Sequence, residues 1–281
     1  LCVREPLSPC EDLCWYDLAM TLKNISKPKS FFGFFVSEIF PSYGGAGGQG
    51  GVILKSLSVL GGDRLLADGM AVWGRFLGWL RDPKFLKASE MAQPKPRDSA
   101  IAWRSHVACW AAHQAVHVDG DFYEFGCYEG FTGALIRSFL GDSFCLNPYG
   151  RKYFWFDRFS GSGSQKKLLL DQKNSFSNAS LRAALYDDIE IFSGDIIDTF
   201  VEKKSSSFAK IAFAHFDLND FEVEIRVLKC VMPRMSKGGV ILFDDYSMIP
   251  FYKQNIAYRE ILRSKGIEIL ELPTGQGVAI F

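Results

Sequence analysis

Three aspartates directly follow two apolar segments in the C-terminal part of the chain. Asp217 follows the run 211–216, and Asp244 and Asp245 follow the run 240–243. If these runs are neighbouring parallel strands, their ends lie about 5 Å apart, and the carboxylates repel one another unless a cation or protons neutralise them. Neither run, nor the residues just after it, contains a Lys or Arg. Because Mg²⁺ prefers oxygen ligands, the spacing predicts a magnesium site, with helix capping as the alternative.

A second set of polar residues follows three earlier apolar segments. Glu124 ends the first segment and runs into a glycine-containing turn, in which Gly126 allows a tight turn and a close approach of a ligand to the backbone. Asp157 ends the second segment, where an acid can bind both hydroxyls of a ribose. Ser193 and Asp195 end the third and form a polar edge suited to an adenine. Since ligands bind outside the carboxyl ends of strands in open α/β sheets, this order predicts a site for a nucleoside-containing ligand.

Short apolar strands alternating with helices would position these residues. Strands are expected at 121–125, 153–156, 189–193, 211–216, 240–243, 267–272 and 278–281, and helices at 132–140, 181–185, 222–231 and 252–264. Such alternation is typical of a mostly parallel, doubly wound α/β sheet with helices on both faces. The last two strands are too close together for a crossover helix, so we expect them to form an antiparallel hairpin.

The first 96 residues do not follow this pattern. Large apolar residues recur at spacings of four and three and predict a helix over 64–80. Asp98 is predicted to cap a helix that runs to about residue 117. The segment 45–50 matches the dinucleotide pattern GxGxxG, but it follows no clear strand and is interpreted as part of a flexible linker or lid. We therefore divide the chain into an N-terminal helical and irregular extension, 1–96, and a catalytic domain, 97–281.

Composition argues against several classes of protein. Basic and acidic side chains number 32 each, so the chain lacks the positive charge of a typical nucleic-acid-binding protein. Hydrophobic residues make up 48% of the chain, which indicates a globular core. No apolar run reaches the roughly 18 residues that span a bilayer. The seven cysteines are scattered, which predicts reduced thiols and a cytoplasmic protein.

Taken together, five segments resemble the macrocin O-methyltransferase (TylF) family. They are EFGCYEGFTG (124–133), FWFDRFSG (154–161), FSGDIIDTF (192–200), HFDLNDFEVEI (215–225) and MSKGGVILFDDY (235–246). The resemblance covers about residues 97–281, and the DDY sequence after a Gly-Gly strand is its most specific part. It implies a Rossmann-like, seven-stranded sheet and a class I enzyme that uses S-adenosylmethionine to methylate sugar hydroxyls in antibiotic biosynthesis.

The resemblance also implies roles for individual residues. The implied S-adenosylmethionine site consists of Glu124, Gly126, Tyr128, Gly130, Thr132, Asp157, Ser193 and Asp195. The implied Mg²⁺ ligands are Asp217, Asp244 and Asp245. In the family, the second acid of an Asp-x-Asp sequence after the fourth strand is assigned as the base. Asn219 stands at that position here and cannot accept a proton at neutral pH. We therefore predict that the base is Asp217 or His215, which lies two residues earlier on the same strand face.

The resulting prediction is a cytoplasmic O-methyltransferase that uses S-adenosylmethionine and Mg²⁺ to methylate a small hydroxylated molecule such as a sugar or glycoside. We expect no nucleic-acid or membrane partner, and a homo-oligomer is compatible with the sequence. One alternative is an NAD(P)-dependent oxidoreductase, although residues 126–133 do not follow its G-x-G-x-x-G spacing. Another is a catalytically inactive adenosylmethionine-binding module, for which Asn219 is the sequence hint.

Overall fold

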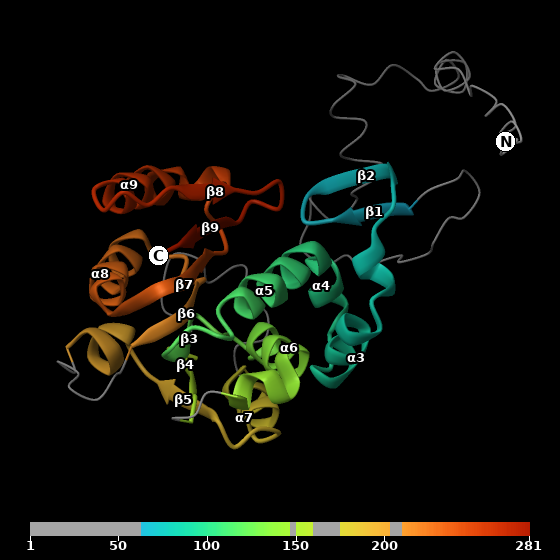
Figure 1. The fold of residues 1–281 in the computed structure, drawn as a ribbon, viewed down its shortest axis with the longest axis horizontal. Helices are drawn as coiled ribbons and strands as arrows, with labels where there is room; N and C mark the ends of the chain where they lie inside the picture. The colour runs from blue at the N-terminus through green and yellow to red at the C-terminus, as the bar shows by residue number, and fades with distance from the viewer. Residues whose placement is uncertain (1–62, 147–149, 160–174, 203–209) are drawn as a thin grey trace, which may run out of the picture. The chain divides into compact units, whose positions relative to one another are not determined.

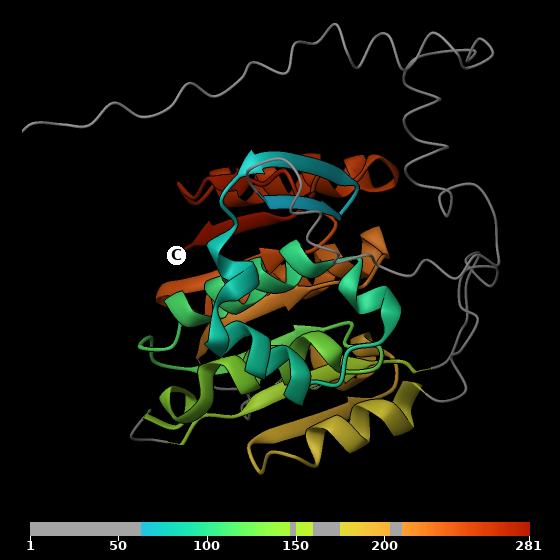
Figure 2. The same ribbon diagram turned by 90° about the vertical axis from the view of Figure 1, so that its right-hand side faces the viewer.

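The computed structural model describes residues 63–146, 150–159, 175–202 and 210–281, all within a compact unit that spans residues 52–281. Its centre is a seven-stranded sheet with the order β5-β4-β3-β6-β7-β9-β8 (Figures 1 and 2). The strands are β3 (Asp121–Phe125), β4 (Tyr153–Asp157), β5 (Ile189–Ser193), β6 (Ile211–Phe216), β7 (Met235–Phe243), β8 (Ile269–Glu271) and β9 (Gly277–Ile280). Strands β3 to β7 are parallel, and β9 runs antiparallel to both β7 and β8. The predicted doubly wound sheet with a terminal hairpin is confirmed.

Helices cover both faces of this sheet (Figure 1). They are α3 (Pro83–Met91), α4 (Pro96–Ser99), α5 (Ala102–Gln114), α6 (Phe131–Leu140), α7 (Ser175–Ala183), α8 (Phe221–Val231) and α9 (Tyr252–Arg263). One apolar cluster joins α3, α5 and α6 to one face of the sheet, and a second joins α8 and α9 to the other. All six residues of β6 are buried, which explains why the central strands read as continuous apolar runs.

The segment 64–80 is not the predicted helix. It forms an antiparallel hairpin of β1 (Asp63–Ala67) and β2 (Met70–Arg75), followed by a short 3₁₀ turn. Asp68 and Gly69 join the strands with φ angles of 55° and 69°. Positive φ at both central residues is what a two-residue hairpin turn needs, and Asp-Gly is a preferred pair for it. The turn sequence therefore outweighs the helical spacing of the apolar residues.

The start of α5 also differs from the prediction. Asp98 belongs to the separate short helix α4, where its side chain accepts a hydrogen bond from the backbone N–H of Lys95 at 2.7 Å. The N-terminus of α5 is capped instead by Asp68 of the β1–β2 turn. This carboxylate accepts hydrogen bonds from the backbone N–H groups of Trp103 (2.9 Å) and Arg104 (3.3 Å). The hairpin thereby fixes the first turn of α5 beside the sheet.

None of the helices in the described parts of the chain combines the length and apolar character that crossing a membrane requires.

Candidate active site

The three aspartates that were predicted to converge do lie together. Strands β6 and β7 are parallel neighbours, with Phe216 paired to Phe243. The pairing continues past the strand ends, because the backbone N–H of Asp244 donates to the carbonyl of Phe216 at 2.9 Å. This places Asp217 beside Asp244 and Asp245 at the carboxyl edge of the sheet, next to the point where the chain changes direction between β3 and β6.

A buried arginine from α5 lies among these carboxylates. The Nη1 atom of Arg104 is 2.6 Å from Oδ2 of Asp244 and 3.3 Å from Oδ1 of Asp245. Its Nε donates to the backbone carbonyl of Thr274 at 3.3 Å and lies 3.7 Å from Oδ1 of Asp68. Burial disfavours the guanidinium charge, but the surrounding aspartates outweigh burial and raise the pKa of Arg104 further. Arg104 is thus a permanent cation of this cluster, and the sequence analysis did not identify it.

His215 supplies a second positive charge. Its Nδ1 lies 3.3 Å from Oε1 of Glu124, and its Nε2 lies 3.7 Å from Oδ1 of Asp244, which is too long for a hydrogen bond. Burial disfavours the imidazolium, but Asp244 and Glu124 outweigh burial and raise the pKa of His215 to about 10. The ring is therefore protonated at neutral pH and has no lone pair to accept a proton. This does not favour the predicted role of His215 as the base.

The three carboxyl groups differ in their affinity for protons. Burial disfavours the charge on Asp244, but Arg104 and His215 hold its pKa well below the usual range. Burial and the charge of Asp244 raise the pKa of Asp245 to about 6. Burial, together with the charges of Asp244 and Asp245, raises the pKa of Asp217 well above its usual value. Asp245 is therefore ionised at neutral pH, and its pKa of about 6 lies close to that pH.

The predicted magnesium site does not fit these contacts. Both carboxylate oxygens of Asp244 have partners, since Oδ2 contacts Arg104 and Oδ1 accepts a hydrogen bond from Nε2 of Gln276 at 2.8 Å. Gln276 is buried and is oriented in turn by Thr274, whose hydroxyl donates to Oε1 of Gln276 at 3.0 Å. Within the described residues, no group of three or more His, Cys, Asp or Glu side chains is arranged to hold a metal ion. As placed, the carboxylates fit a guanidinium.

Asp157 organises the other half of the sheet edge. Its Oδ2 accepts a hydrogen bond from the backbone N–H of Tyr128, and its Oδ1 accepts one from Phe159, both at 2.7 Å. Tyr128 and Phe159 have φ angles of 49° and 52°, which bulky residues rarely adopt. Burial raises the pKa of Asp157, and its backbone hydrogen bonds oppose this effect. Asp157 thus holds the turn after β3 and the turn after β4 together, where the sequence predicts a ribose.

The glycines of the turn after β3 are required by close packing. Gly126 has a φ angle of 91°, and a Cβ atom there would lie 2.0 Å from the carbonyl oxygen of Asp217. In α6, a Cβ atom on Gly133 would lie 2.4 Å from both Oε2 of Glu124 and the ring of Trp155. The turn therefore passes directly against the end of β6. Gly130 and Thr132 lie at the start of α6, Gly130 with a φ angle of 74°.

Ser193 and Asp195 lie at the outer end of this edge. Ser193 is paired with Asp157 in the sheet. Asp195 forms an ion pair with Arg158, and its Oδ1 accepts a hydrogen bond from the backbone N–H of Ile197 at 2.9 Å. The predicted adenine contact of Asp195 is not tested by these contacts, which show that it orders the turn after β5.

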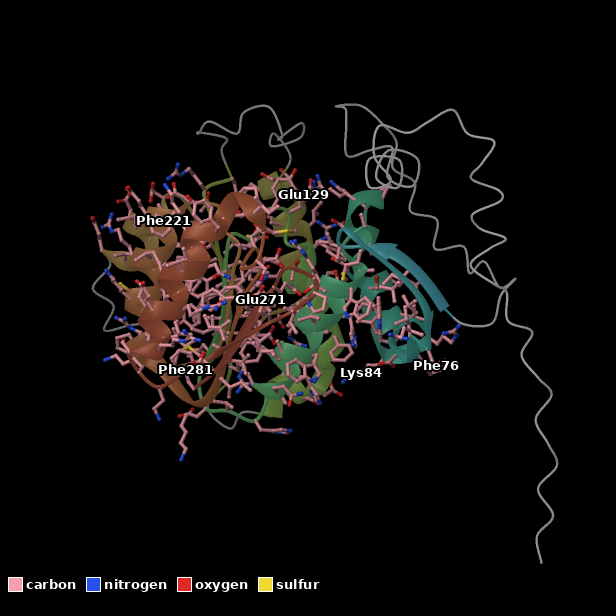
Figure 3. All side chains as sticks on the ribbon, turned by 90° about the horizontal axis from the view of Figure 1, so that it is seen from above. Phe76, Lys84, Glu129, Phe221, Glu271 and Phe281 are labelled. Atoms are coloured by element: carbon pink, nitrogen blue, oxygen red, sulfur yellow. The ribbon has the colours of Figure 1, made fainter. Side chains whose placement is uncertain are left out.

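Glu129, labelled in Figure 3, anchors the turn after β3 to its surroundings. Its buried carboxylate contacts Nζ of Lys95 at 2.7 Å, the guanidinium of Arg97, and Nδ2 of Asn178 at 3.1 Å. Arg182 of α7 donates to its backbone carbonyl at 2.7 Å. Burial opposes ionisation, but Lys95 and Arg97 outweigh it and lower the pKa of Glu129. No local feature of the sequence indicates this anchor, since the partners of Glu129 are more than 30 residues away.

Comparison with known proteins agrees with this fold. Residues 123–246 match the model of a methyltransferase domain family. The O-methyltransferase NovP is similar in structure, with a TM-score of 0.52 and 18% sequence identity, over 69% of this chain and 86% of NovP. CalS11, a TDP-rhamnose 3'-O-methyltransferase of calicheamicin biosynthesis, matches with a TM-score of 0.51 and 18% identity, over 70% of this chain and 93% of that chain. No curated protein matches the sequence.

The matched residues 123–246 run from β3 to the end of β7 and contain every strand end described above. The prediction of a methyltransferase is thereby confirmed, whereas membership of the macrocin O-methyltransferase family stays a prediction. Residues 123–246 are similar to a methyltransferase domain family, and the chain has the fold of O-methyltransferases.

Proposed function

We propose that the chain transfers a methyl group from S-adenosylmethionine to a hydroxyl group of a small molecule, most simply a sugar or glycoside. The observation that carries the proposal is the pairing of two half-sites on one sheet edge. The turns ordered by Asp157 form one half, and the cluster around Arg104 forms the other, across the β3–β6 switch point. The similarity to sugar O-methyltransferases supports the choice of acceptor.

The first half-site suits a nucleoside. Asp157 supplies carboxylate oxygens at the edge of the sheet that could accept hydrogen bonds from ribose hydroxyls, and the absent side chain at Gly126 would let a ligand approach the backbone. When bound, S-adenosylmethionine supplies a methyl group on a sulfonium.

The second half-site suits an acceptor hydroxyl. Asp245 is more accessible than Asp244, with 19% of its side chain exposed against 12% for Asp244. With a pKa of about 6, Asp245 is ionised at neutral pH and can take the acceptor proton. As the O–CH₃ bond forms, the proton passes to Asp245 and the S–CH₃ bond breaks, which leaves a neutral thioether. Asp245 thus takes the role of base that the sequence analysis gave to Asp217 or His215.

The proposal is tested first by calorimetric titration with S-adenosylmethionine and with NAD. We expect the chain to bind S-adenosylmethionine and not NAD. Binding of NAD without binding of S-adenosylmethionine would favour the oxidoreductase alternative. Turnover is then measured with sugar nucleotides, glycosides, phenols and RNA. Asp245→Asn should lower kcat by about 10²-fold or more, the usual contribution of a general base, with little change in cofactor affinity. Asp198→Asn, an exposed residue after β5, is the matched control. Cofactor binding without turnover of any acceptor would indicate an inactive binding module, and methylation of RNA alone would refute the acceptor class.

A further inference from the structure

Three separate elements hold the Arg104 side chain in place. The β1–β2 turn presents Asp68, the end of β7 presents Asp244 and Asp245, and the β8–β9 loop presents the carbonyl of Thr274. The side chain is only 10% exposed. An arginine on a flexible surface would not have partners on three sides, so this position is built for a guanidinium.

A divalent ion at the same carboxylates would have to displace Arg104. The closest contact of Arg104 is with Oδ2 of Asp244, and Oδ1 of Asp244 already accepts a hydrogen bond from Gln276. Moving the guanidinium away would also leave Asp68 buried without its cation, since that side chain is fully inaccessible. With Arg104 in place, a second cation at Asp244 and Asp245 would face like-charge repulsion from the guanidinium.

We infer that Arg104 is the resident cation of the acceptor site and that this chain methylates its acceptor without a divalent metal ion. The inference deepens the proposed function and rests on it for the identity of the reaction. Nη1 and Nε make the contacts described above, and Nη2 makes no hydrogen bond within the described residues, so it is the donor that faces an acceptor oxygen. A guanidinium stabilises the developing negative charge on that oxygen through a hydrogen bond, while the proton still passes to Asp245.

The experiment measures Mn²⁺ binding to the whole chain by electron paramagnetic resonance, with Mn²⁺ as the spectroscopic probe for a divalent site. We expect no saturable site in the wild-type chain at millimolar Mn²⁺. Arg104→Gln removes the guanidinium and should create one Mn²⁺ site, which the further change Asp245→Asn removes. Arg263→Gln is the matched control, because Arg263, the last residue of α9, forms an exposed ion pair with Glu268, which is not part of the cluster. In parallel, turnover of the wild-type chain should be the same in excess chelator as in Mg²⁺.

One equivalent of Mn²⁺ bound to the wild-type chain and lost in Asp245→Asn would overturn the inference, as would loss of turnover in chelator and its return with Mg²⁺. Should Arg104→Gln fail to fold, the wild-type titration and the chelator assay still decide. Arg104→Lys keeps the charge but loses the forked geometry, so turnover should fall without the appearance of a Mn²⁺ site. Failure of the proposed function itself would appear separately, as absence of S-adenosylmethionine binding in calorimetry.

Discussion

The substitution Gly126→Ala tests whether the turn after β3 is pressed against the end of β6. Its φ angle of 91° disfavours any residue with a Cβ atom, at a cost of about 1–2 kcal/mol. The new Cβ atom would also lie 2.0 Å from the carbonyl oxygen and 2.6 Å from the carbonyl carbon of Asp217. Because both are backbone atoms, the contact cannot be relieved by a rotamer change, and overpacking of this kind costs about 1–3 kcal/mol more. The expected loss in the free energy of unfolding is therefore about 2–5 kcal/mol.

Gly266→Ala provides the control. Gly266 follows α9 with a φ angle of 74°, and its added Cβ atom would have no heavy atom within 4 Å. This variant has the conformational cost of about 1–2 kcal/mol alone. At about 2–4 °C per kcal/mol for a domain of this size, Gly126→Ala should lower Tm by several degrees more than Gly266→Ala does. Urea denaturation gives the free energies, and calorimetry should show weaker S-adenosylmethionine binding in Gly126→Ala alone. Equal losses of stability in the two variants would refute the close approach at Gly126.

Three further predictions concern acidic residues. Asp157→Ala should weaken S-adenosylmethionine binding by about 1.5–3 kcal/mol, as expected for the loss of hydrogen bonds to a charged group. Unchanged affinity in calorimetry would show that Asp157 does not bind the ribose. Burial raises the pKa of Asp68 from 3.8 to about 6, so the folded state binds this proton more tightly than the unfolded state does. The free energy of unfolding should therefore fall as pH rises from about 4 to about 6 and should level off above that. Asp68→Asn should lose that part of the pH dependence in urea titrations, and an unchanged pH profile would contradict the assignment. The rate should rise with pH around an apparent pKa of about 6 as Asp245 ionises, and Asp245→Asn should lack this rise.

The central strands β3, β4 and β6 could be predicted because nearly all of their residues are buried, whereas β5 at the edge of the sheet is only partly buried. The expected ranges 121–125, 189–193 and 211–216 coincide with β3, β5 and β6. A continuous apolar run bounded by polar residues has few other interpretations in a chain with alternating helices. The hairpin at 63–75 was missed because leucines, Met70 and Trp73 recur at helical spacing while the turn signal occupies only the two residues Asp68 and Gly69. The two-residue turn Asp68–Gly69 therefore determined the structure of this segment.

The convergence of Asp217 with Asp244 and Asp245 could likewise be predicted, since it follows from strand order alone. The charge state of the cluster could not. The pKa of His215 depends on Glu124 of β3 and Asp244 after β7, which the sheet brings to either side of it. Whether Asp244 binds a metal ion or a fixed cation depends on Arg104, which lies 140 positions earlier in the chain.

That residue did carry a signal of its own. Arg104 lies on α5 in line with Ala108 and Ala111, at the helical spacings of four and seven, and all three are buried. A helix face that is otherwise made of small apolar residues does not bury an arginine without a carboxylate partner, because an unpaired charge in the interior is too costly. The segments that contain Asp217, Asp244 and Asp245 have no Lys or Arg of their own to neutralise these carboxylates. Each feature alone suggested capping or packing. Joined, the buried arginine and the uncompensated aspartates indicate one ion cluster in which the protein supplies its own positive charge.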